Sequence, residues 1–267
     1  MNDAPIGVFD SGIGGLTVVA AIMRTLPDER VVYVGDTARV PYGPKSPETV
    51  LRYSRQIAAW LLEQQVKAIV IACNTATAHA LEALQREMPV PVIGVVQPGA
   101  RAAVNTTRNG HIGVIGTTGT INSGAYHRAI AALSETAIVT GTACPLLVPL
   151  VEEGWLDHPA TRLIAESYLA PMQAAAIDTL VLGCTHYPLL APIIGEVVGP
   201  GVTLVDSAAE TALALRDVLE QRSITASGRA TALAHRFVAT DAPEAFRRVG
   251  QRFIGPALDH VETTIFA

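Results

Sequence analysis

The sequence predicts an α/β fold of two similar domains, each with a mainly parallel β-sheet flanked by helices. Two observations support this prediction. Short apolar runs rich in Val and Ile alternate with longer amphipathic runs, and the order of strands and polar turns in the first half recurs in the second. Alternating strands and helices favour right-handed crossovers and parallel pairing, and a chain of 267 residues suits two such domains.

Eight runs are predicted as buried strands, because they are brief and apolar on both faces. They cover residues 6–9, 31–34, 68–72, 92–95, 111–115, 137–139, 179–182 and 202–205. Between them the apolar residues recur at spacings of three and four, as in helices packed on one face. One helix is predicted to begin after Ser46 and Pro47, a cap and first-turn pair. Another is predicted from a capping box, Ser207 to Glu210, to about Gln221.

An internal repeat predicts how the domains are arranged. Residues 68–75 (AIVIACNT) resemble residues 179–186 (TLVLGCTH), and residues 7–12 (GVFDSG) resemble residues 113–119 (GVIGTTG). We therefore expect two pseudo-symmetric Rossmann-like domains, residues 1–95 plus 208–267 and residues 96–207. Ligands of such sheets bind at the carboxyl ends of the strands, so the polar turns should line a cleft between the domains.

The composition excludes several classes of protein. The chain is 49% hydrophobic with a formal charge of −5, and its cations are scattered, so we expect neither disorder nor nucleic-acid binding. Three widely spaced cysteines indicate free thiols in a reducing compartment rather than disulfides or a zinc site. We find no secretory signal and no apolar run long enough for a membrane span, and we expect a cytoplasmic location.

The repeated cysteines carry the chemical prediction. Cys73 and Cys184 each follow a strand and a small residue and precede two polar residues. A helix N-terminus at such a position can lower the pKa of a thiol from about 8.5. Two thiols on opposite walls of one cleft suit removal of a proton from a carbon and delivery of another to the opposite face, which inverts a stereocentre. Cys144 lacks this setting and is expected to pack in a core.

A cofactor is not expected for this chemistry. Pyridoxal phosphate needs a Schiff-base lysine, and the chain has only Lys45, in a proline-rich loop, and Lys67, beside a predicted strand. The turn at Gly12 to Thr17 lacks the final glycine of a dinucleotide fingerprint, and no metal-binding motif occurs.

Other polar residues fall near the thiols in the predicted topology. Asp10, His186 and Glu152 can relay protons or hold an ammonium group, although the sequence does not distinguish Glu152 from Glu153. Donors for substrate carboxylates lie in turns before helices. These donors are Ser11, Asn74, Thr75, Thr117, Thr120 and Thr185.

Two other functions fit parts of this pattern. Cys184 and His186 could be the nucleophile and base of a hydrolase, which leaves Cys73 without a role. The two domains could also close on an amino acid without catalysis. In that case, replacing either cysteine would leave the function intact.

Six motifs, in order, resemble the glutamate racemases of the aspartate/glutamate racemase superfamily. They are GVFDSGIGGLTV (7–18), GDTARVPYG (35–43), IACNTATA (71–78), GVIGTTGT (113–120), VPLVEEG (148–154) and LGCTHYPLL (182–190). The resemblance covers essentially the whole chain. It implies two α/β domains with the active site between them and cofactor-independent interconversion of L- and D-glutamate, with D-glutamate destined for peptidoglycan.

The resemblance also implies roles for residues. Cys73 and Cys184 would be the acid/base thiols, assisted by Asp10 and His186, with Glu152 near the second thiol. Around them, Ser11, Tyr42, Gly43, Asn74, Thr75, Thr117, Thr120 and Thr185 would hold the substrate. A homodimer is expected, as is the absence of the N-terminal extension found in members regulated by a cell-wall precursor. Aspartate racemase, with a substrate one methylene shorter, remains the alternative.

Overall fold

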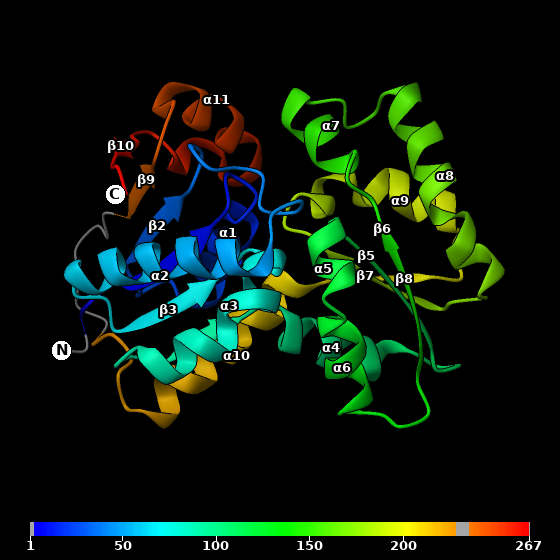
Figure 1. Ribbon diagram of the computed structural model, residues 1–267, viewed down its shortest axis with the longest axis horizontal. Coiled ribbons are helices and arrows are strands. Elements are labelled where there is room, and N and C mark those ends of the chain that lie inside the picture. The colour runs from blue at the N-terminus through cyan, green and yellow to red at the C-terminus, as the bar shows by residue number, and fades with distance from the viewer. Residues whose placement is uncertain (1–2, 228–234, 267) are drawn as a thin grey trace.

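Two parallel β-sheets organise the molecule, which is described here by a computed structural model for residues 3–227 and 235–266. Each sheet forms the centre of a lobe, and the two lobes lie side by side (Figure 1). The first sheet has the order β10-β9-β2-β1-β3-β4 and the second the order β6-β5-β7-β8, with every pairing parallel. The predicted fold class is therefore confirmed.

The strands match the predicted runs closely. Those of the first sheet are β1 (Ile6–Asp10), β2 (Val31–Gly35), β3 (Ala68–Ile71), β4 (Val92–Gly94), β9 (Arg236–Ala239) and β10 (Glu262–Thr263). Those of the second are β5 (His111–Gly116), β6 (Ile138–Ala143), β7 (Thr179–Gly183) and β8 (Thr203–Asp206). Strand β6 runs past its predicted end because its polar half still pairs with β5. The short strands β9 and β10 have no counterpart in the prediction.

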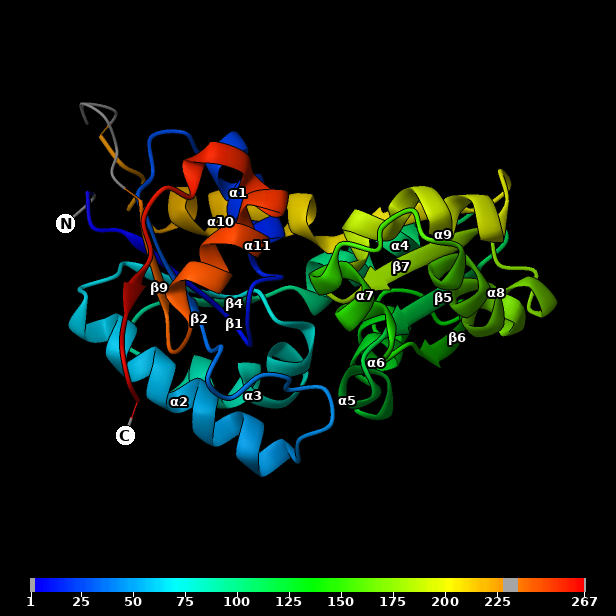
Figure 2. The ribbon, with the colours of Figure 1, turned by 90° about the horizontal axis from the view of Figure 1, so that it is seen from above.

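Helices cover both faces of each sheet (Figure 2). Around the first sheet lie α1 (Leu16–Thr25), α2 (Pro47–Glu63), α3 (Asn74–Glu87), α10 (Ser207–Gln221), α11 (Pro243–Ile254) and the 3₁₀ turn η2 (Gly255–Ala257). Around the second lie α4 (Val96–Thr106), α5 (Thr118–Asn122), α6 (Ala125–Ala131), α7 (Leu147–Glu153), α8 (Pro159–Ala174), α9 (Ala191–Val198) and the 3₁₀ turn η1 (Tyr187–Leu190).

The two predicted helix starts have different outcomes. Ser46 caps α2 as predicted, because its side chain accepts a hydrogen bond from the Thr49 amide. Helix α10 also exists with the predicted end, but its predicted cap is wrong. Asp206 caps it by accepting from the Ala208 amide, while Ser207 is the first helical residue. Asp206, at the end of β8, comes one residue before Ser207, so its carboxylate is the group that reaches the first free amides of the helix.

Alternation along the strands builds two hydrophobic cores on each sheet. In β1, Val8 packs into the core beneath α1 and α10, whereas Phe9 packs into the core beneath α2 and α3. In the second sheet, Ile115 faces the core with α7, α8 and α9, and Val114 faces the core with α4 and α6. All four side chains are fully buried, and each such burial stabilises the fold by about 1.5–3 kcal/mol. The sheets are thus rigid supports for the turns at their carboxyl ends.

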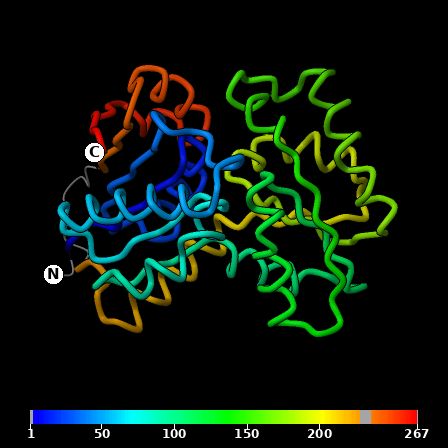
Figure 3. Tube along the Cα trace, in the orientation of Figure 1, coloured from blue at the N-terminus to red at the C-terminus, as the bar shows by residue number. Residues whose placement is uncertain are grey.

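The chain crosses between the lobes at the start of α4 and at the start of α10, as its trace shows (Figure 3). The division into residues 1–95 plus 208–267 and residues 96–207 stays a proposal. Its support is that all strands of the first sheet fall in the first two segments and those of the second sheet in the third. Residues 1–2, 228–234 and 267 of the proposed first domain lie outside the described residues. None of the helices described is long and apolar enough to cross a membrane.

Candidate active site

A cavity of about 410 Å³ lies between the two lobes, at the carboxyl ends of β1, β3, β5 and β7. Both repeated cysteines line it, and each is only 6% exposed. Its other lining residues are Ser11, Val40, Pro41, Tyr42, Gly43, Pro44, Asn74, Thr75, Thr117, Thr118, Pro145, Val148, Pro149, Glu152, Thr185 and His186. This thiol pocket therefore takes residues from both halves of the internal repeat.

Cys73 follows β3 and caps helix α3. Its sulfur accepts a hydrogen bond from the Ala76 amide at 3.4 Å, and its thiol donates to Ser11 Oγ at 3.7 Å. The expected lowering of the pKa by the helix is wrong for this residue. Burial, followed by the negative charge of Asp10, raises the pKa of Cys73 to about 12 and outweighs the amide bond.

Cys184 follows β7 and begins a different turn. The 3₁₀ turn η1 comes next, with Pro188 near its start, so Cys184 does not cap an α-helix as the matched sequence suggested. Its sulfur lies 3.9 Å from Nδ1 of His186, whose Nε2 lies 3.0 Å from Oε1 of Glu152. The three side chains form a chain of contacts from the buried thiol to the more exposed end of α7. Glu153 is exposed and takes no part in it.

His186 is positively charged at neutral pH in this setting. Burial lowers the pKa of its imidazole, but the hydrogen bonds and negative charges of Cys184 and Glu152 together raise it further, to about 10. The ring packs edge-on against Phe253 of α11, with ring centroids 5.9 Å apart.

Asp10 lies behind the pocket surface. Its carboxylate is fully buried and accepts from the Gly12 amide at 2.9 Å and from Thr185 Oγ1 at 3.3 Å. Burial raises the pKa of Asp10, although the charge of His186 opposes the shift. A Cβ atom on Gly14 would overlap Thr185 Oγ1, so glycine there allows the turn after β1 to touch the turn after β7.

Three threonines join the lobes on the other side of the pocket. Thr75 Oγ1 lies 2.7 Å from Thr117 Oγ1 and 3.2 Å from Thr120 Oγ1, and the latter two lie 3.0 Å apart. Nearby, Asn74 Oδ1 accepts from the Tyr126 hydroxyl, while Asn74 Nδ2 is buried and has no hydrogen-bond partner among the described residues. A buried donor without a partner is costly, so Asn74 is suited to an acceptor on a bound ligand.

A loop before α2 closes the pocket from the first lobe. The buried carboxylate of Asp36 accepts from Arg39 Nε at 2.8 Å, from the Tyr42 hydroxyl and from Thr240 Oγ1 at 3.0 Å. These bonds order the loop and leave the Tyr42 hydroxyl engaged. Further along, the carbonyl of Gly43 accepts from the Gly119 amide of α5 at 2.8 Å, which ties the loop to the second lobe.

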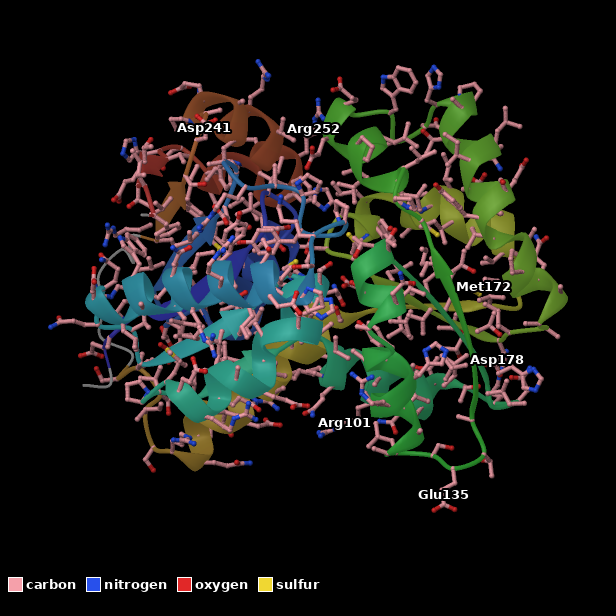
Figure 4. The ribbon with its side chains drawn as sticks, viewed as in Figure 1. Arg101, Glu135, Met172, Asp178, Asp241 and Arg252 are labelled. Carbon is pink, nitrogen blue, oxygen red and sulfur yellow. The ribbon has the colours of Figure 1, made fainter. Side chains whose placement is uncertain are left out.

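Helix α11 also reaches across the lobes. Arg252 Nη1 donates to the carbonyl of Glu152 at 2.8 Å and to that of Val151 at 3.4 Å. Figure 4 shows Arg252 in the space between α11 and α7. This contact holds the end of α7, and with it the residue that faces His186.

The structure brings most of the sequence-predicted site residues into this pocket, with two exceptions. Asp10 and Thr120 do not line it. Asp10 accepts a hydrogen bond from Thr185, and Thr120 lies within hydrogen-bond distance of Thr75 and Thr117. The wall residues that the site prediction missed are Val40, Pro41, Pro44, Thr118, Pro145, Val148 and Pro149. For all of them except Thr118 a signal was available, because they lie in proline-containing segments of the sequence.

Neither lysine lines the thiol pocket. Lys67 is buried and forms an ion pair with Glu29 at 2.6 Å, and Lys45 lines a neighbouring cavity. A Schiff-base anchor for pyridoxal phosphate is therefore missing from the walls of this pocket.

Comparison with known proteins agrees with the geometry. The profile of the Asp/Glu/Hydantoin racemase family matches residues 6–215. A glutamate racemase from Geobacter metallireducens is 53% identical over 256 residues, which cover 96% of this chain and 94% of that protein. The crystal structure of a glutamate racemase isoform from Bacillus anthracis has a TM-score of 0.93 and 41% identity, covering 100% of this chain and 98% of that one. Glutamate racemase from Francisella tularensis, in complex with D-glutamate, has a TM-score of 0.93 and 37% identity, covering 100% and 99%.

Proposed function

This chain belongs to the Asp/Glu/Hydantoin racemase family, and we propose that it inverts glutamate with two thiols, Cys73 and Cys184, and no cofactor. Its activity as an isomerase acting on glutamate rests on relatives of about 50% identity over nearly the whole chain. The proposal adds the residues and the route of the proton.

One observation carries the mechanism: both thiols line a single pocket large enough for one amino acid, and they come from opposite lobes. In one direction, the thiolate of one cysteine takes the proton from Cα, leaving its electron pair on the carbon. The thiol of the other cysteine then donates its proton to the opposite face. The stereocentre is inverted, and the two sulfur atoms have exchanged protonation states.

The neighbours of each thiol suit these roles. Cys73 is a thiol at neutral pH, because burial raises its pKa to about 12. His186, held by Glu152, lies beside the sulfur of Cys184 at 3.9 Å, within reach of a proton on that thiol. Asn74 Nδ2 and the threonine hydroxyls supply donors for the substrate carboxylates.

Incubation with L-glutamate in heavy water tests this mechanism. A two-thiol racemase places deuterium on Cα of the product enantiomer before it appears in recovered substrate, as followed by NMR and polarimetry. Cys73→Ala and Cys184→Ala should each abolish inversion. Cys144→Ala is the matched control, because Cys144 is buried and does not line the pocket. Turnover retained by either of the first two variants would contradict the mechanism.

The same experiment separates the alternatives. A hydrolase using Cys184 and His186 would leave the Cα proton of glutamate in place, and a binding protein would retain ligand affinity without exchange. Parallel incubation with L-aspartate tests the shorter substrate. Its two carboxylates are one methylene closer together, so the pocket walls would have to approach each other by about that length to hold both.

The biological setting is also proposed. We infer that the product, D-glutamate, serves peptidoglycan synthesis and that the protein acts in the cytoplasm as a homodimer. All three cysteines are free thiols, in keeping with a reducing compartment. Isotope tracing of glutamate into cell-wall precursors and sedimentation of the pure protein would test these points.

A further inference from the structure

A second cavity, of about 460 Å³, adjoins the thiol pocket on the side of α2, α3, α5 and α6. Its charged wall consists of Lys45, from the loop before α2, and Arg128, from α6 of the other lobe, with His79 of α3 beside them. Asn122 and Ser123 add polar groups, and no carboxylate lines it among the described residues.

The two cavities differ in charge. In the thiol pocket, His186 is paired with Glu152 and the carboxylate of Asp10 is buried behind the wall, and no Lys or Arg lines this pocket among the described residues. Glutamate carries two carboxylates and one ammonium group, so it enters as an anion. The whole chain is also negative, with a formal charge of −5. The Lys and Arg side chains that can attract such a substrate therefore line the cavity next to the thiol pocket.

The two cavities share part of their walls. Gly43, Pro44 and Thr118 line both of them, and the hydrogen bond from the Gly119 amide to the Gly43 carbonyl lies at this boundary. Lys45 follows Pro44 directly, so the second cavity continues along the chain from the wall of the thiol pocket.

One cation is held at the cavity by a hydrogen bond, since Arg128 Nη1 donates to the carbonyl of Ser123 at 2.7 Å. The backbone of Lys45 is fixed by the bond from its amide to the carbonyl of Tyr42 at 3.0 Å. Burial lowers the pKa of His79, against the effect of nearby Glu48, so its imidazole is neutral at pH 7. Lys45 and Arg128 are thus the two cationic side chains of this wall.

We propose that this second cavity is an anion-capturing vestibule, in which Lys45 and Arg128 bind a carboxylate of the dicarboxylic substrate before it passes to the thiols. The inference rests on the proposed function and extends it, because it assigns the residues that draw an anionic substrate toward the thiol pocket. Two cations in a concave wall concentrate anions locally, and their field extends over roughly 8 Å at 0.15 M salt. Their effect is on substrate binding and not on the chemical step, so it belongs to KM.

Charge-neutral variants test the vestibule. Lys45→Gln and Arg128→Gln should each raise KM for glutamate about threefold at low salt, and together about tenfold, with kcat unchanged. The difference in KM between these variants and the unmodified protein should become smaller as salt is added. Lys45→Arg keeps the charge and should keep KM. Arg222→Gln is the matched control, because it removes an exposed cation that lines neither cavity.

Calorimetric binding of glutarate gives a second measurement that does not depend on turnover. This dicarboxylate has no stereocentre, and the double variant should bind it about tenfold more weakly at low salt. One outcome is that the double variant racemises glutamate with the same KM, glutarate affinity and salt dependence as the unmodified protein. That result would overturn the vestibule and leave the proposed function standing. Salt-dependent weakening of glutarate binding without any racemisation would support the vestibule and overturn the proposed function. An equal effect of Arg222→Gln would overturn the vestibule by showing that net charge alone is responsible.

Discussion

Nε2 of His186 lies 3.0 Å from Oε1 of Glu152, and this contact connects a side chain that is 5% exposed to one that is 34% exposed. His186 in turn meets the sulfur of Cys184 through its other ring nitrogen. A change in the charge of Glu152 therefore alters the electrostatic surroundings of His186, which contacts the buried thiol.

Replacing Glu152 by Gln should shift the pH profile of the reaction. The hydrogen bonds and charges of Cys184 and Glu152 raise the pKa of His186 to about 10, so the imidazole is protonated below that pH and loses its proton above it. Without the carboxylate this pKa falls, and the alkaline limb of kcat should move to lower pH, with kcat at pH 8 reduced about tenfold. Glu153→Gln is the control, since Glu153 is the exposed neighbour. Identical alkaline limbs in both variants would contradict the role of Glu152.

Cys73 should react as a high-pKa thiol in the free protein. Burial and the charge of Asp10 raise its pKa to about 12, and only the thiolate is alkylated. The rate constant for carbamidomethylation of Cys73 should rise about tenfold per pH unit from pH 7 to 10 without levelling, as measured by mass spectrometry of the peptide. Asp10→Asn should increase the rate. A plateau below pH 9 would show that the thiolate is already stabilised before substrate binds.

Replacing Gly14 by Ala should push apart the turns after β1 and β7. The new Cβ would overlap Thr185 Oγ1 and lie 2.5 Å from Nδ1 of His186. Overpacking of this kind costs about 1–3 kcal/mol of unfolding free energy, and kcat/KM should fall with it because His186 is displaced. Denaturant unfolding and racemisation assays measure the two effects. Gly201→Ala is the control, since a Cβ there meets nothing within 4 Å.

Replacing Arg252 by Gln should loosen α7 from α11. The guanidinium donates to the carbonyls of Glu152 and Val151, and losing such bonds costs about 1 kcal/mol, or roughly 2 °C in Tm for a chain of this size. We expect kcat to fall as well, because Glu152 is less well held against His186. Arg248→Gln, an exposed change on the same helix, should alter neither quantity. Equal effects of the two changes on kcat would argue against a specific contact.

The parts of the fold that could be predicted are those that depend on short stretches of sequence. Strands such as β1 and β7 are short, apolar and bounded by turns, so their positions follow from neighbouring residues alone. The cap of α10 could not be chosen in this way, because Asp206 and Ser207 are both good caps. The end of β8 determines which of the two meets the free amides.

Short stretches of sequence also could not decide which acidic residue belongs to the site. Glu152 and Glu153 are adjacent on a helix, where successive side chains point about 100° apart. Only the packing of α7 turns Glu152 toward His186. The expected lowering of the Cys73 pKa failed for a related reason, because burial and the charge of Asp10 come from the surrounding tertiary structure and outweigh the local helix.

By itself the sequence determined the strands, the repeated cysteine turns and the family resemblance, because these depend on residue type, spacing and order along the chain. Only the tertiary structure decided which acidic residue meets His186, which side chains lie behind the pocket wall, and where the cations gather. Those properties arise from distances between residues far apart in the chain, which local pattern does not specify.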